Sequence, residues 1–174
     1  TVGLLQTQDV LYLTALKSLT YRILIAWSVL DESMKLIYSD DYGENWSQPI
    51  DILGPGLLSA KRSAMLNLTE WESGTICLSF FGLSISRSYY KLSYDNGLSW
   101  ESDPFEFPRI NNENIRELSI ISIGEDSLLA IFERSSSESR GIYSRMSTDN
   151  GSIWSDSLII SDNGYFEKSD FKSA

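Results

Sequence analysis

The sequence contains the octapeptide Ser39-Asp40-Asp41-Tyr42-Gly43-Glu44-Asn45-Trp46 and repeats its pattern twice, as Ser93-Tyr94-Asp95-Asn96-Gly97-Leu98-Ser99-Trp100 and Ser147-Thr148-Asp149-Asn150-Gly151-Ser152-Ile153-Trp154. All three copies read Ser-x-Asp-x-Gly-x-x-Trp. They begin at positions 39, 93 and 147, so the interval between successive copies is the same both times. An identical interval found twice indicates a repeated supersecondary unit with a period of 54.

The octapeptide has the composition of a tight turn between two strands. Its Gly adopts a positive φ without strain, and its Asp carboxylate accepts hydrogen bonds from turn amides, as Ser does more weakly. Its Trp supplies a large apolar ring that packs between neighbouring units. A catalytic residue has no reason to recur in every copy, so we predict structural roles for the shared residues, which are Ser39, Asp41, Gly43, Trp46, Ser93, Asp95, Gly97, Trp100, Ser147, Asp149, Gly151 and Trp154.

The rest of the chain keeps the same period. A step of 54 aligns Leu24, Leu78 and Phe132, which predicts units without insertions. Short runs of β-branched and aromatic residues between turn signals predict four strands in each unit and no long helix. The expected units span residues 8–56, 57–110 and 111–161, and residues 162–174 are either a tail or a strand that reaches a neighbouring unit.

Composition narrows the chemistry of this 174-residue chain. It has no His, which excludes Ser-His-Asp catalysis and His-ligated metals, and one Cys, which excludes an intrachain disulfide and a Cys-rich zinc site. Its formal net charge is −10, so we expect neither nucleic acid nor membrane insertion. No cofactor or metal ion is expected. Cys77 aligns with apolar positions of the other units and is expected in the core.

The octapeptides resemble the Asp-box, or BNR repeat, and the chain resembles the sialidase-like β-propeller superfamily over residues 8 to 161. The resemblance implies an all-β fold of three four-stranded blades around a central channel, with the boxes on the outer rim, away from the ligand face. It does not imply one activity, because the same box occurs in sialidases, xyloglucan hydrolases, sorting receptors and phage tail proteins.

Three blades do not close a ring, since propellers usually have four to eight. Two explanations stay open: the chain forms a homo-oligomer that closes the ring, or it belongs to a larger assembly or a longer polypeptide. The compartment is not determined, although an extracellular, cell-surface or virion location is favoured over the cytoplasm.

Arg62 and Arg116 are the first candidates for a binding site. Each lies at the same separation from the octapeptide that follows it, at the start of a predicted inner strand. Guanidinium groups there can hold a carboxylate or sulfate in bidentate fashion. Glu117 follows Arg116, so an ion pair between blades is the alternative. Family sialidases carry an Arg in a Phe/Tyr-Arg-Ile-Pro motif, which Tyr21-Arg22-Ile23-Leu24 matches at three of four positions, but the period places Arg22 on a second strand.

Other candidates are Arg134, at the end of a second strand, and the aromatic-basic pair Arg87 and Tyr89. Exposed aromatic rings stack on sugars, although strand aromatics more often pack in a core. No catalytic residue can be assigned. We therefore expect a non-catalytic or degenerate sialidase-like module that binds a glycan or surface ligand in a virion or adhesion assembly. An exo-sialidase-type glycoside hydrolase and a purely structural assembly protein are the alternatives.

Overall fold

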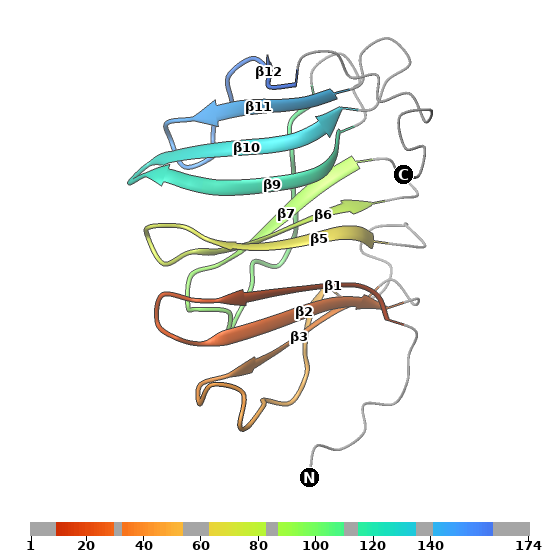
Figure 1. Cartoon of the computed structure of the whole chain (residues 1–174), viewed down its shortest axis with the longest axis vertical. Coiled ribbons are helices and arrows are strands. Elements are labelled where there is room, and N and C mark those ends of the chain that lie inside the picture. The colour runs from red at the N-terminus through yellow and green to blue at the C-terminus, as the bar shows by residue number, and fades with distance from the viewer. Residues whose placement is uncertain are drawn as a thin grey trace, which may run out of the picture.

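A computed structural model of the chain describes residues 10–29, 33–53, 63–82, 87–109, 115–134 and 141–161, with only the backbone described for residues 63 and 64. The described residues form three four-stranded antiparallel sheets (Figure 1). The first sheet contains β1 (Val10–Lys17), β2 (Ile23–Val29), β3 (Met34–Ser39) and β4 (Ile50–Leu53). The second contains β5 (Ser63–Glu70), β6 (Ile76–Gly82), β7 (Arg87–Ser93) and β8 (Phe105–Glu106). The third contains β9 (Ile115–Gly124), β10 (Ser127–Arg134), β11 (Gly141–Ser147) and β12 (Leu158–Ile159).

Each sheet is a meander in which consecutive strands pair, so the predicted all-β class with four strands per unit is confirmed. The sheets follow one another in a stack, with the first at the bottom of Figure 1 and the third at the top. In the described part of the chain, none of the three sheets closes on itself. This arrangement is consistent with a β-propeller-like fold. Among the described residues there is no helix long and apolar enough to cross a membrane.

Two hydrophobic clusters hold the stack together. The first joins Leu24, Ala26 and Leu36 of the first sheet to Leu78 and other residues of the second. The second joins the other face of the second sheet to the third and includes Cys77, which is fully buried as expected. Burial raises the pKa of the Cys77 thiol. Each junction is therefore sheet-on-sheet packing of apolar side chains, which is the main favourable term in folding.

The strict period of 54 is wrong for the second strands. The second-strand residues that pair with the first serine of each octapeptide are Ile23, Ile76 and Leu128. Successive residues of this set are 53 and 52 positions apart instead of 54. Leu24 consequently packs toward the following sheet, whereas Leu78 packs toward the preceding one. The slip arises because the hairpins joining the second and third strands differ in length, and a shift of one residue moves a side chain to the opposite face of a sheet.

The third strands keep the period and carry two buried cations that the sequence reasoning missed. Lys91, 3% exposed, donates from Nζ to the carbonyl oxygen of Ile52 in β4 at 2.6 Å, across the first junction. Arg145, 1% exposed, occupies the equivalent position and donates to the carbonyl oxygen of Pro108, just after β8, across the second junction. Burial lowers the pKa of Lys91. Both cations therefore tie their sheet to the end of the sheet before it.

Candidate functional site

The three octapeptides form the same hydrogen-bonded turn. In the first, the hydroxyl of Ser39 donates to Asp41 Oδ1 at 2.8 Å and accepts the amide of Gly43 at 2.8 Å. Asp41 Oδ1 also accepts the amide of Asn45 at 2.8 Å. The other two copies make the same three bonds at 2.7–2.9 Å. The amide of Asn45 holds the pKa of Asp41 below its ordinary value. These carboxylates therefore bind their own turns.

Two successive left-handed residues close each turn. Tyr42 and Gly43 have φ values of 59° and 93°, and the pairs beginning at Asn96 and Asn150 are alike. Such pairs are typical of type I′ hairpins, where Asn-Gly is preferred. Gly97 has a second constraint, because an added Cβ would lie 2.3 Å from Cδ2 of Leu24 in the first sheet. The second turn is thus packed directly against the preceding sheet.

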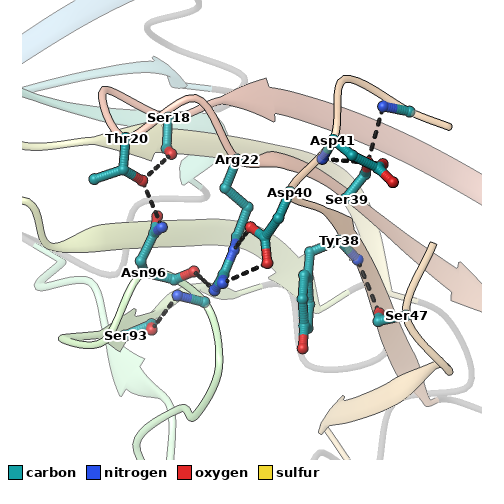
Figure 2. A network of polar contacts seen from close by, with 12 residues as sticks. Ser18, Thr20, Arg22, Tyr38, Ser39, Asp40, Asp41, Ser47, Ser93 and Asn96 are labelled. Carbon is teal, nitrogen blue, oxygen red and sulfur yellow. Dashed lines mark hydrogen bonds and ion pairs between the residues drawn. The ribbon is translucent and has the colours of Figure 1, made fainter. Parts of the chain in front are cut away.

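Arg22 also belongs to this end of the sheets, hereafter the octapeptide end. Figure 2 shows its guanidinium between Asp40, which it binds through Nε at 2.6 Å and Nη2 at 3.0 Å, and the carbonyl oxygen of Asn96, at 3.0 Å from Nη1. The side-chain amide of Asn96 donates to Thr20 Oγ1 at 2.6 Å. Hydrogen bonding to Arg22 lowers the pKa of Asp40. Arg22 thus links the first sheet to the second octapeptide and lies away from the predicted inner-strand site.

Four arginines lie at the opposite end of the second and third sheets, hereafter the arginine end: Arg87, Arg109, Arg116 and Arg134. Arg87 and Arg116 occur where β7 and β9 begin, and Arg134 where β10 ends. The sequence prediction included Arg87, Arg116 and Arg134 but missed Arg109, which lies outside the repeated positions. Arg62 lies outside the described residues.

Arg116 has the most distinctive surroundings of the four. Its guanidinium carbon lies 5.6 Å from the centre of the Phe81 ring, and its Nε is buried with no hydrogen-bond partner among the described residues. In the sheet, Arg116 lies opposite Glu133. By strand pairing relative to the octapeptide serines, Phe81 is the residue of the second sheet that is equivalent to Glu133. Phe81 lies opposite Ala64, so Arg116 has no Arg counterpart at the paired position of the second sheet.

Glu117 is exposed and has a φ of 48°. It lies in a register irregularity of β9, and Met65, with a φ of 58°, lies in the corresponding irregularity of β5. Non-glycine residues rarely adopt this conformation, and a β-bulge changes the direction of the side chains beside it. No sequence signal marks these bulges, since neither residue is Gly or Asn. Because of the bulge, the side chain of Arg116 is out of step with the alternation of faces along the rest of β9.

Arg134 and Arg87 are both engaged by neighbours. The guanidinium carbon of Arg134 lies 5.3 Å from the centre of the Tyr143 ring. Arg87 binds Glu106 at 2.6 Å, and Glu106 lies 3.7 Å from Arg109. The arginine end therefore contains glutamates as well as arginines, with cations in the majority among these described side chains.

Tyr89 is not an exposed platform. It is 8% exposed and its ring stacks on Phe80, with centroids 5.8 Å apart, within the first hydrophobic cluster. Burial raises the pKa of Tyr89. Its ring face is taken up by packing, which corrects the expectation that it stacks on a sugar. Within the described part of the chain, no group of three acidic, Cys or His side chains forms a metal site.

No protein-family model matches the chain, and no curated protein matches it. Solved structures do. A Hadza microbial sialidase matches 83% of this chain with a TM-score of 0.54 and 18% identity, over 32% of its own length. A GH43 beta-1,3-galactosidase matches 82% with a TM-score of 0.58 and 14% identity, over 30% of its length.

A PL25 ulvan lyase, a polysaccharide lyase, matches 85% of the chain with a TM-score of 0.53 and 14% identity, over 41% of its length. The chain therefore spans between about a third and two fifths of these proteins. At such low identity the likeness concerns the fold alone. It shows that this chain has a sialidase-like, all-β fold.

Proposed function

We propose that the chain is a set of sialidase-like propeller blades with Asp-box turns, and that its arginine end binds an anionic glycan without cleaving it. The observation that carries the proposal is the grouping of Arg87, Arg109, Arg116 and Arg134 at one end of the sheets in a chain of net charge −10. The fold likeness to sugar-active proteins supports a saccharide as the ligand.

Arg116 is the anchor of the proposed site. Its planar guanidinium offers several N–H donors in a fork that matches a carboxylate or sulfate. Packing on Phe81 restrains the side chain, which lowers the entropy lost on binding. Arg134 is restrained by Tyr143 in the same way. Charge-assisted hydrogen bonds contribute about 1.5–3 kcal/mol each, enough for weak binding of one sugar residue.

Binding is favoured over hydrolysis by the state of the tyrosines at this end. A Tyr nucleophile must be exposed to the sugar, and its phenolate must be accessible near neutral pH. Tyr89 and Tyr143 are each 8% exposed, and burial raises the pKa of Tyr89, which opposes nucleophilic activation. Neither tyrosine is therefore exposed to a sugar.

The proposal is tested by binding to an array of sialylated, sulfated and neutral oligosaccharides. We expect binding to the acidic sugars, weakened about tenfold by Arg116→Ala, which corresponds to about 1.4 kcal/mol. Lys35→Ala, which removes a positive charge from the first sheet, is the matched control and should leave binding unchanged. Equal binding to neutral sugars, or unchanged binding by Arg116→Ala, would contradict the proposal. Turnover of a fluorogenic sialoside by the wild type would contradict its non-catalytic part.

A further inference from the structure

The outer face of the third sheet is aliphatic and open to solvent. On β10 it carries Leu129 and Ile131, which alternate with the buried residues that pack on the second sheet. On β11 it carries Ile142 and Met146, which are 47% and 46% exposed. A contiguous exposed aliphatic patch is typical of a surface that contacts another protein surface.

The same positions in the first sheet are already covered. Strand pairing relative to the octapeptide serines makes Leu129 equivalent to Leu24 and Ile131 equivalent to Ala26. Leu24 and Ala26 are fully buried against the second sheet. The outer face of the third sheet thus repeats the face of the first sheet that the second sheet covers.

The outer face of the first sheet repeats the other half of a junction. It carries Ile23, Ile25 and Trp27, which alternate along β2 with the residues that face the second sheet. By strand pairing they are equivalent to residues of β6 and β10 that pack on the preceding sheet: Ile76, Leu78 and Phe80, and Leu128, Ala130 and Phe132. The pattern of two aliphatic positions followed by an aromatic ring is kept, apart from one Ala.

Part of this face is open to solvent. Trp27 is itself buried, but Ile23 and Ile25 are only half-buried. Leu13 of β1 pairs with Trp27 and therefore shares its face, and it is 64% exposed. Lys35, which pairs with Trp27 and donates to Asp51 at 2.7 Å, also lies on this face. The first sheet thus presents an aliphatic surface with one ion pair at the position where the other two sheets meet a neighbour.

We infer that a second copy of this chain covers both faces, head to tail, so that the third sheet of one copy packs on the first sheet of the other. The outer face of the third sheet corresponds to one half of an internal junction, and the outer face of the first sheet corresponds to the other half. A second copy of the chain therefore fits both faces. Two copies give six sheets, within the usual range for a closed propeller. Because one partner supplies both contacts, a two-fold axis relates the two copies and the ring closes with two chains. The inference does not depend on glycan binding.

Two positions make this contact weaker than the internal junctions. Lys35 of the first sheet occupies the place of the buried Tyr89 and Tyr143. Lys91 and Arg145 tie their sheets to the preceding one, but the equivalent residue of the first sheet is Ile37. The contact between copies therefore lacks a charge-assisted hydrogen bond from this position. Association depends on apolar packing and should vary with protein concentration in the accessible range.

The test is the mass of the full chain in solution, measured by light scattering on a sizing column over a range of concentrations. We expect twice the 19.7 kDa of one chain at high concentration. Ile142→Asp on the third sheet and Leu13→Asp on the first should each give monomers, because each places a charge in the contact. Ile153→Asp, at a residue 73% exposed in the third octapeptide, is the control and should stay dimeric.

Mixing the two monomeric variants gives the decisive result. The unaltered third sheet of Leu13→Asp can pack on the unaltered first sheet of Ile142→Asp, so the mixture should form a dimer that neither variant forms alone. Circular dichroism confirms that each variant is folded before mixing. A wild-type monomer at every concentration, a dimer sensitive to only one of the two substitutions, or folded variants that fail to associate on mixing would each overturn the inference.

Discussion

The octapeptide end and the arginine end of the sheets differ in whether their polar contacts recur from one sheet to the next. At the octapeptide end, Asp41 and its counterparts bind the amides of their own turns, and Arg22 is bound by Asp40 and Asn96. At the arginine end, Arg116 keeps a buried Nε without a partner among the described residues, beside the left-handed Glu117.

In the proposed function, this difference separates residues that hold the fold from residues that bind the ligand. The octapeptide residues recur in every copy because each sheet needs the same turn. The residues around Arg116 do not recur at the paired position of the second sheet, so the scaffold alone does not require them. Left-handed backbone and buried polar atoms without a partner occur at both ends of the described sheets, so the lack of recurrence is what sets Arg116 apart.

The largest expected effect concerns Gly97, where a turn meets the neighbouring sheet. Gly97→Ala should cost about 2–4 kcal/mol of the free energy of unfolding, because it adds overpacking against buried Leu24 to the strain of a φ of 86°. Gly74→Ala is the matched control, since Gly74 has a φ of 80° but no atom within 4 Å of the added Cβ, and should cost only about 1 kcal/mol. Urea denaturation measures both, and equal losses would show that the contact with Leu24 is unimportant.

The next effect compares an arginine from each end. Arg22→Ala should cost about 1–2 kcal/mol of stability, because it removes hydrogen bonds to Asp40 and to the Asn96 carbonyl of the second sheet. Arg116→Ala should change stability by less than about 0.5 kcal/mol. Thermal and urea unfolding of the two variants provide the measurement. A larger loss for Arg116→Ala would assign the arginine end a structural role instead.

The smallest effect is a gain in stability. Tyr42 has a φ of 59°, at the position where the other two octapeptides have Asn, and it is 73% exposed. Tyr42→Asn should raise the free energy of unfolding by about 0.5 kcal/mol, because Asn tolerates the left-handed region better. Tyr94→Asn, at an exposed octapeptide residue without a positive φ, should give no gain. A loss of stability in Tyr42→Asn would mean that the contact between Tyr42 and Tyr21 outweighs the backbone preference.

Local sequence alone accounts for the turns and the strand count. Ser-x-Asp-x-Gly-x-x-Trp acts over a short stretch of chain, so the bonds between its Ser, Asp and Gly form in each copy regardless of the neighbouring sheets. The alternation of β-branched and aromatic residues between turns placed the strands for the same local reason. The spacing between Arg22 and the first octapeptide also predicted that Arg22 lies at the start of the second strand and not on the inner strand.

Packing between sheets sets which face each side chain occupies and which polar groups meet. The one-residue slip that puts Leu24 and Leu78 on opposite faces depends on hairpin lengths and strand pairing, which the repeat period does not contain. The burial of Lys91 and Arg145 and the packing of Tyr89 depend on a neighbouring sheet. Contacts between residues far apart in the chain are set by packing and desolvation over the whole stack, and a local pattern carries no information about them.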